Sequence, residues 1–295
     1  MIPANSSSTG TDDSRIPFTK MTGSGNDFIL IDNRTLQLDR EQARELTRMA
    51  CRRKLSVGAD GLILIENDPE ADFRWLFLNA DGSEAEMCGN GSRCAARFVY
   101  LNGIVKKDRM TFRTLAGLIE AQILGERVKV RMTPPHGLET GFRVDSVDGA
   151  PPLHFINTGV PHVAWFVEDA EQLENIDVFN LGRTLRFHPR FQPAGTNVNF
   201  ALVRGRHDLS IRTYERGVEA ETLACGTGSI ACALLAAARG LADSPVNVLT
   251  RSGETLIIHF ENISQEGRIQ FSGVYLEGGA SVVYEAELWN ETLRR

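Results

Sequence analysis

The chain has 295 residues, of which 42% are hydrophobic and 24% charged, and its formal net charge is −6 at pH 7. This length and composition are typical of a globular protein with about two domains. The absence of a basic excess argues against a nucleic-acid partner. The longest plainly apolar run, residues 230–238, is too short to cross a bilayer, so no membrane partner is expected.

The first 15 residues contain neither the basic nor the apolar region of a secretory signal, and we expect residues 1–15 to be a disordered extension or tag. An odd number of widely spaced cysteines does not indicate a disulfide framework. The sequence also lacks a CxxC pair and a matching histidine spacing, so it predicts no metal site. Reduced thiols and a cytoplasmic location are therefore expected. The cysteines are Cys51, Cys88, Cys94, Cys225 and Cys232.

Short runs rich in β-branched and aromatic residues, separated by Gly, Asn and Asp, predict strands joined by turns. They lie at 28–32, 62–66, 74–79, 129–132, 162–167, 198–203 and 209–214. A helix is predicted over 39–52, with Asp39 as its N-cap. Two further helices are predicted over 92–101 and 229–239, each followed by a glycine that suits a helix end.

The chain repeats a motif of the form E-x-x-x-C-G-[NT]-G-S. Residues 84–95 read EAEMCGNGSRCA and residues 221–233 read ETLACGTGSIACA. A Thr-Gly pair precedes each motif at nearly the same distance, at Thr22 and at Thr158. Two features held in register indicate a duplicated domain.

The duplication predicts an α/β fold of the α+β type with two pseudo-symmetric domains. Each is expected to be a β-sheet or barrel wrapped around a central helix, with the active site in the cleft between them. The predicted N-terminal domain spans 16–134, with a strand at about 281–295 returning to it. The predicted C-terminal domain spans 135–280.

The repeated Cys-Gly-x-Gly turn suits acid–base chemistry. The thiolate is the reactive form of cysteine, and a helix N-terminus can lower its pKa to roughly 3.5–7.5. Unpaired N–H groups at that end also bind carboxylates. Two such turns around one small anion could remove a proton from one face of a carbon, with one cysteine as thiolate, and return it to the other face, with the second cysteine as thiol.

At these residues the chain resembles the diaminopimelate epimerase family. The resemblance covers almost everything from Phe18 onward. Its segments are FTKMTGSGNDFILID (18–32), VGADGLI (57–63), LNADGSEAEMCGNGSRCAARF (78–98), NTGVPHV (157–163), GTNVNF (195–200) and TYERGVEAETLACGTGS (213–229). It implies an isomerase that converts L,L-diaminopimelate to the meso form in lysine and peptidoglycan precursor synthesis. It also implies that this epimerase uses no cofactor and that its partner is a small-molecule amino-acid substrate.

The resemblance also assigns roles to individual positions. Cys88 and Cys225 match the acid–base pair, and His162 and Glu215 match residues that tune the reacting end. The remaining matches are substrate-binding positions. They are Asn26, Asn79, Gly89, Asn90, Asn197, Glu215, Arg216, Gly226 and Thr227.

Two positions depart from the family pattern. Gly61 stands where many members have Gln, and Val160 where many have Asn, so neither side-chain contact is carried over. One extra residue also lies between Arg216 and Cys225 compared with a common family spacing. Tyr284 resembles a family tyrosine at a dimer contact, which implies a homodimer.

Three other interpretations remain open from the sequence. A proline or hydroxyproline racemase would have the same fold, although such enzymes usually carry His where this chain has Asn90. Cys88 and Cys225 could instead form a regulatory disulfide. A non-catalytic binding protein for small amino acids is the third.

Overall fold

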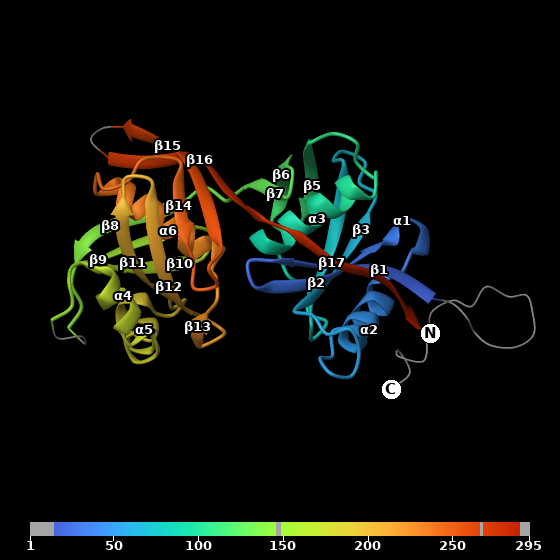
Figure 1. Cartoon of the computed structure of the whole chain (residues 1–295), viewed down its shortest axis with the longest axis horizontal. Coiled ribbons are helices and arrows are strands. Elements are labelled where there is room, and N and C mark those ends of the chain that lie inside the picture. The colour runs from blue at the N-terminus through green and yellow to red at the C-terminus, as the bar shows by residue number, and fades with distance from the viewer. Residues whose placement is uncertain (1–14, 146–148, 266–267, 290–295) are drawn as a thin grey trace, which may run out of the picture. The chain divides into compact units, whose positions relative to one another are not determined.

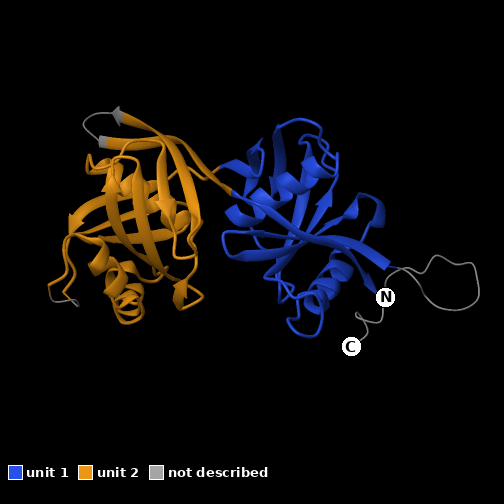
Figure 2. Ribbon diagram, viewed as in Figure 1, with its two compact units in different colours: residues 1–130, 279–295 blue, residues 131–278 orange. Residues whose placement is uncertain are grey.

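The computed structural model describes residues 15–145, 149–265 and 268–289. Within them the chain forms two compact units, which Figure 2 colours separately. Unit 1 comprises residues up to Val130 together with those from Gly279, and unit 2 comprises Arg131–Gly278. The extension predicted at 1–15 lies outside the described residues except for Arg15.

Unit 1 is a mixed sheet with helices on its faces (Figure 1). The order of pairing is β17–β1–β2–β3–β4–β5–β6–β7, in which β2–β3 and β4–β5 are parallel and the other pairs up to β6–β7 antiparallel. Its elements are β1 (Arg15–Gly23), β2 (Asn26–Asp32), α1 (Asn33–Leu36), α2 (Arg40–Ala50), β3 (Gly61–Glu66), β4 (Phe73–Asn79), α3 (Gly89–Leu101), β5 (Arg109–Thr114), β6 (Gly117–Leu124), β7 (Arg127–Arg131) and β17 (Ser281–Trp289).

Unit 2 has the same plan. Neighbouring strands pair in the order β8–β9–β10–β11–β12–β14–β15–β16, with β10–β11 and β12–β14 parallel, and β13 pairs with β12. Its elements are β8 (His136–Phe142), β9 (Leu153–Asn157), β10 (Pro161–Phe166), α4 (Ala170–Asn175), α5 (Val178–Arg186), a 3₁₀ turn (Pro189–Phe191), β11 (Asn197–Gly205), β12 (Asp208–Glu215), β13 (Ala220–Thr222), α6 (Gly226–Ala238), β14 (Val246–Leu249), β15 (Thr255–Gln265) and β16 (Arg268–Gly279).

One central helix is packed inside the sheet of each unit. Helix α3 contacts β1, β2, β3 and β6, and α6 contacts β9, β10, β11, β12, β14 and β15. Helix α6 is apolar around its whole circumference, and every residue from Gly228 to Ala237 is buried, as expected of a helix enclosed on all sides. The predicted fold class of two related α+β domains is confirmed.

Both central helices begin three residues earlier than the sequence predicted. The amide of Ser92 donates to the carbonyl of Cys88 at 2.8 Å, and that of Ser229 to Cys225 at 2.9 Å. The Gly-x-Gly segments therefore form the first helical turn, and each cysteine becomes the N-cap. The prediction placed the helix after the glycines because glycine normally breaks helices, but here the enclosing sheet supplies the stability.

The predicted strands and the helix at 39–52 are also present, with ends shifted by up to two residues. Asp39 is the N-cap of α2 and forms a capping box with Gln42. The strands of unit 2 that the sequence left unassigned include β8, which is largely exposed and lacks a continuous apolar run. Their pairing within the sheet decides their conformation.

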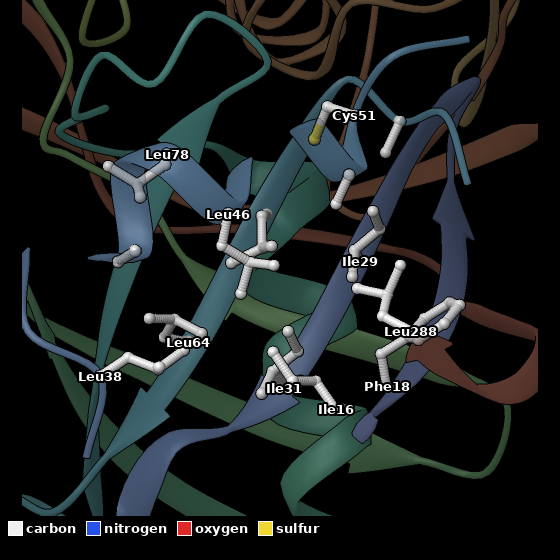
Figure 3. Close-up of a cluster of buried hydrophobic side chains, with 14 of the residues drawn as sticks. Ile16, Phe18, Ile29, Ile31, Leu38, Leu46, Cys51, Leu64, Leu78 and Leu288 are labelled. Carbon is white, nitrogen blue, oxygen red and sulfur yellow. The ribbon is translucent and has the colours of Figure 1, made fainter. Parts of the chain in front are cut away.

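Strands β2 and β3 are buried on both faces, which explains their continuous apolar runs. Ile29, Ile31 and Leu64 pack with Leu46 of α2 in one cluster (Figure 3). The intervening side chains point the other way, toward α3, where Ile63 lies against Gly91. The sheet of unit 1 therefore packs between α2 and α3. This packing determines the position of the first turn of α3.

This packing gives a stability prediction. Leu64 is fully buried in the cluster, so Leu64→Ala should lower the free energy of unfolding by about 2–5 kcal/mol, because it removes buried methyl groups and leaves a cavity. Urea denaturation measures the change. The matched control is Leu55→Ala, whose side chain is 72% exposed, with an expected change within about 0.5 kcal/mol. Equal effects of the two substitutions would contradict the described packing.

Candidate functional site

The predicted site residues lie in two groups. The first half-site comprises Cys88, Gly89, Asn90, Asn26 and Asn79 of unit 1. The second half-site lies in unit 2 and is made up of Cys225, Gly226, Thr227, His162, Asn197, Glu215 and Arg216.

Cys88 begins α3 in the first half-site. Its backbone is extended, and the amide of Gly91 donates to Sγ at 3.4 Å. The side chain is half-buried. The first N–H groups of a helix have no partner within the helix, so the amides of Gly89 and Asn90 are suited to an anion beside the thiol.

A chain of hydrogen bonds fixes the orientation of Asn90. The amide nitrogen of Asn26 donates to Asp60 at 2.8 Å, and the amide nitrogen of Asn90 donates to Asn26 Oδ1 at 2.8 Å. A carboxylate only accepts, so Asp60 determines the direction of both bonds. Asn90 Oδ1 is then left as a buried acceptor with no partner among the described residues.

Ion pairs hold Asp60, the residue at the far end of this series of hydrogen bonds. Arg53 contacts Asp60 at 2.8 Å and Asp27 at 2.6 Å, and buried Lys20 contacts Asp27 at 2.8 Å. Burial tends to raise the pKa of Asp27, but hydrogen bonds and the charges of Arg53 and Lys20 outweigh it and hold that pKa below its usual value. The ion pairs thereby keep Asp27 and its neighbour Asn26 in place.

Asn79 and Gly61 face each other in the pairing of β3 with β4. The amide of Asn79 donates to the hydroxyl of Ser83 at 3.0 Å, so its own turn holds this side chain. A Cβ on Gly61 would lie 2.6 Å from the carbonyl of Leu78 and from the ring of Phe77. The glycine allows the strands this close approach, and a longer side chain at 61 requires a displacement of β4.

Cys225 begins α6 in the second half-site, but its environment differs from the sequence prediction. The residue is 7% exposed, and Sγ lies 3.5 Å from the hydroxyl of Thr227. The sequence predicted a lowered thiol pKa at this helix N-terminus. Instead, burial and then the negative charge of Glu215 raise the pKa of Cys225 to about 12, against opposing hydrogen bonds from Thr227 and Gly228. The correction follows from desolvation, which disfavours the thiolate.

A polar patch lies on the sheet face that α6 covers. His162 is opposite Asn197 in the β10–β11 pairing, and Asn199 is opposite Thr213 in the β11–β12 pairing. Because side chains alternate along a strand, Asn197 and Asn199 share one face, and so do Thr213 and Glu215. We call these five residues the polar face of unit 2. Burial raises the pKa of Glu215, although a hydrogen bond with Thr222 acts the other way.

Asn197 joins two loops at one end of this polar face. Its amide nitrogen donates to the carbonyl of Pro161 at 3.1 Å, and its Oδ1 accepts from the amide of Arg216 at 2.8 Å. The guanidinium of Arg216 donates to the carbonyl of Ala194 at 2.6 Å. The predicted pair Glu215-Arg216 is therefore tied directly to Asn197.

The start of α6 is tied to the second Thr-Gly turn. The hydroxyl of Thr158 donates to the carbonyl of Thr227 at 3.1 Å. Asn157 accepts from the amide of Gly159 at 3.0 Å, so its side chain stabilises this turn. The repeated Thr-Gly pair thus has a structural role beside the second cysteine.

His162 is completely buried, and its pKa is lowered to about 3. Burial is the main cause, and the positive charge of Arg216 adds to it, while the hydrogen bond with Asn199 opposes the shift. The imidazole is therefore neutral near pH 7. Its Nε2 is buried without a partner among the described residues.

Sequence reasoning missed three residues of these half-sites. Asp60, Asn199 and Thr213 each bond directly to a predicted residue or to its partner. The sequence could have indicated Asn199, because it follows Asn197 by two positions in a predicted strand and so shares its face. Recognising it required the strand pairing that places Thr213 and His162 on the same side.

The described ranges contain no cluster of three or more His, Cys, Asp or Glu side chains that could hold a metal ion. Over the same ranges, no helix has both the length and the apolarity that crossing a membrane would require.

A profile described as diaminopimelate epimerase matches residues 18–137 and 154–282. The chain belongs to the diaminopimelate epimerase family. Its relatives include proteins of that name from Aquifex aeolicus, 49% identical over 94% of this chain and 99% of the relative, and from Archaeoglobus fulgidus, 41% identical over 95% and 99%.

Solved structures share the fold of this family member. A phenazine biosynthesis protein of the PhzF family from Bacillus anthracis superposes with a TM-score of 0.70 at 16% identity, over 93% of this chain and 99% of its own. A hydroxyproline epimerase from Agrobacterium vitis gives 0.64 at 16% identity, over 93% and 92%. At this identity the likeness concerns the fold alone.

The buried neutral His162 makes stability depend on pH. Its pKa is about 3 when folded and about 6.5 when unfolded, so its contribution is fully present above pH 6.5 and is lost as the pH falls toward 3. Between pH 7 and pH 5 the wild type should lose about 2 kcal/mol of unfolding free energy through this residue. His162→Gln should lack that part of the loss.

Urea denaturation of both proteins at the two pH values measures the difference. His207→Gln, which alters an exposed histidine, is the matched control and should follow the wild type. An identical pH dependence of the His162→Gln variant and the wild type would mean that His162 is not held neutral in the folded protein.

Proposed function

We propose that this protein is a cofactor-independent diaminopimelate epimerase. It inverts the α-carbon of L,L-diaminopimelate to give the meso form, in the synthesis of lysine and peptidoglycan precursors. The observation that carries the proposal is the pair of cysteines, each the N-cap of a central helix, in a chain of the diaminopimelate epimerase family.

The reaction needs two groups that exchange roles. One sulfur, as thiolate, takes the α-hydrogen as a proton, and the electron pair of the broken C–H bond passes into the substrate carboxylate. The second sulfur, as thiol, gives its proton to the opposite face of the same carbon. The carbon is inverted, and the first sulfur ends as thiol and the second as thiolate. This requires Cys88 and Cys225 to reach the same carbon.

The buried state of Cys225 supports its assignment as the thiol in the ligand-free protein. A pKa of about 12 leaves it protonated near pH 7, ready to act as the proton donor. Cys88 is half-buried, and its sulfur accepts a hydrogen bond from the amide of Gly91; it then acts as the base in the same turnover. In the reverse direction, Cys225 must lose its proton in the presence of substrate.

The helix N-termini lower the barrier to proton removal. An α-proton is only weakly acidic, and negative charge develops on the substrate carboxylate as the proton leaves. The amides of Gly89 and Asn90, and those of Gly226 and Thr227, belong to the first helical turns, where N–H groups and the helix dipole stabilise such charge. The same sites that present the sulfurs thus bind the reacting carboxylate.

The remaining predicted residues hold the substrate. Arg216 suits the far carboxylate because a guanidinium donates two parallel hydrogen bonds. Glu215 suits an ammonium group, and Asn26, Asn79 and Asn197 can donate or accept. The direct bond between the Arg216 amide and Asn197 supports a shared role for these two residues. His162, neutral and buried beside them, tunes the reacting end.

The proposal includes a cytoplasmic location. Cys225 reacts as a free thiol, and a reducing compartment keeps both reactive cysteines in that state.

Substitution of each cysteine tests the mechanism. Cys88→Ser and Cys225→Ser should each reduce epimerisation by about 10²-fold or more, because a hydroxyl is a far weaker base and a poorer acid at this position. The measurement is incorporation of deuterium from D₂O at the α-carbon of diaminopimelate under reducing conditions, alongside conversion of the L,L form to the meso form.

Cys232→Ala is the matched control, since it removes a thiol from the buried middle of α6 and should retain turnover. Proline is tested in parallel as the alternative substrate. Deuterium exchange on proline without exchange on diaminopimelate would overturn the substrate assignment. Full activity of either serine variant would overturn the two-thiol mechanism.

We include a homodimer in this proposal, on the evidence of β17. Val283, Tyr284 and Trp289 on this strand are 54%, 42% and 49% exposed. The ring of Tyr284 packs edge-on against that of Phe18, with 6.0 Å between the ring centroids. Exposed apolar residues along one strand are typical of a protein interface. Tyr284→Glu should shift the mass measured by light scattering toward the monomer, whereas Tyr100→Glu, at an exposed position of α3, should not. A monomeric wild type would refute the dimer.

A further inference from the structure

The buried amide of Asn199 has contacts that determine its orientation. Its nitrogen lies 3.0 Å from the carbonyl oxygen of Val163 and 3.1 Å from Nδ1 of His162. Its oxygen lies 3.0 Å from the hydroxyl of Thr213. Since a carbonyl oxygen only accepts, the group facing Val163 must be the NH₂ of Asn199.

This orientation fixes the proton on His162. One hydrogen of the Asn199 NH₂ is donated to Val163, and the other points at His162 Nδ1. That nitrogen must therefore accept, and an acceptor Nδ1 carries no hydrogen. In the neutral ring the hydrogen is then on Nε2, because the bond made by one ring nitrogen decides the state of the other.

Asn199 itself has little freedom to turn. It is fully buried, and a Cβ on Gly228 of α6 would lie 2.4 Å from its Oδ1 and 3.3 Å from Sγ of Cys225. The first turn of α6 therefore packs directly on this amide. A flipped Asn199 would set its oxygen against the carbonyl oxygen of Val163, which cannot donate, so a hydrogen bond in the interior would be lost.

We propose that Asn199 is a positioning residue that holds His162 in its Nε2–H tautomer, so that the ring serves this site as a neutral hydrogen-bond donor and not as a proton acceptor. The inference rests on the proposed function for its catalytic consequence. Its structural part does not, because the tautomer follows from the contacts of Asn199 alone. The buried Nε2–H, without a partner among the described residues, is the group offered to the bound substrate or to a thiolate.

Nitrogen NMR of ¹⁵N-histidine-labelled protein tests the tautomer directly, with the His162 signals assigned by their loss in His162→Gln. In the wild type at pH 7 the ring should give the Nε2–H pattern. Asn199→Asp replaces the donor NH₂ with an oxygen that only accepts, so it should convert His162 to the Nδ1–H or doubly protonated form. Asn180→Asp, the same change at an exposed position at the start of α5, should leave the His162 signals unaltered.

Kinetics with L,L-diaminopimelate test the consequence. Asn199→Asp should lower kcat by roughly tenfold or more, with a smaller change in KM, because a wrong tautomer at a catalytic histidine removes stabilisation from the transition state. If Asn199→Asp does not fold, Asn199→Ala, which removes the donor without adding charge, should give a mixture of tautomers and an intermediate kcat.

The outcomes separate this inference from the proposed function. A wild-type His162 in the Nδ1–H or charged form overturns the inference, whatever the activity. A lowered kcat in Asn199→Asp with an unchanged tautomer also overturns it. An Nε2–H wild type with no turnover of diaminopimelate supports the role of Asn199 toward His162 and refutes the proposed function instead.

Discussion

The candidate site of this protein depends on helix N-termini that are buried inside a sheet. A helix end has N–H groups without partners in the helix, and enclosing it removes the water that would otherwise satisfy them. Cys88 and Cys225 stand at these two ends. The same burial that makes the N–H groups effective toward an anion makes a thiolate costly, and for Cys225 the second effect is the larger.

The two half-sites stabilise their polar groups in different ways. In unit 1, Asn26 and Asn90 are held through Asp60 by ion pairs with Arg53, near the surface. In unit 2, buried His162 and Asn199 are held by neutral hydrogen bonds among strands β10, β11 and β12. The second arrangement is fully desolvated, so the protonation state of each group there is set by its neighbours.

Much of the fold could be predicted from the sequence because local patterns agree with the final packing. The runs at 28–32 and 62–66 are apolar except at their last residues, Asp32 and Glu66, and they became strands buried on both faces. Asp39 was recognisable as an N-cap because capping chemistry is local. The starts of α3 and α6 were misplaced since the glycines are helical only when the sheet encloses them. The predicted domain bounds and the roles of the site residues stay predictions.

The sequence alone located the two thiols, because the duplicated Cys-Gly-x-Gly motif is visible without any knowledge of packing. It also identified the family, since Asn26, Asn197, Glu215 and Arg216 lie in motifs of fixed spacing. Only the tertiary structure decided the raised pKa of Cys225, the neutral state of His162 and the hydrogen bonds of Asn199. Desolvation and hydrogen-bond direction arise from groups far apart in the chain, and no local pattern of residues records them.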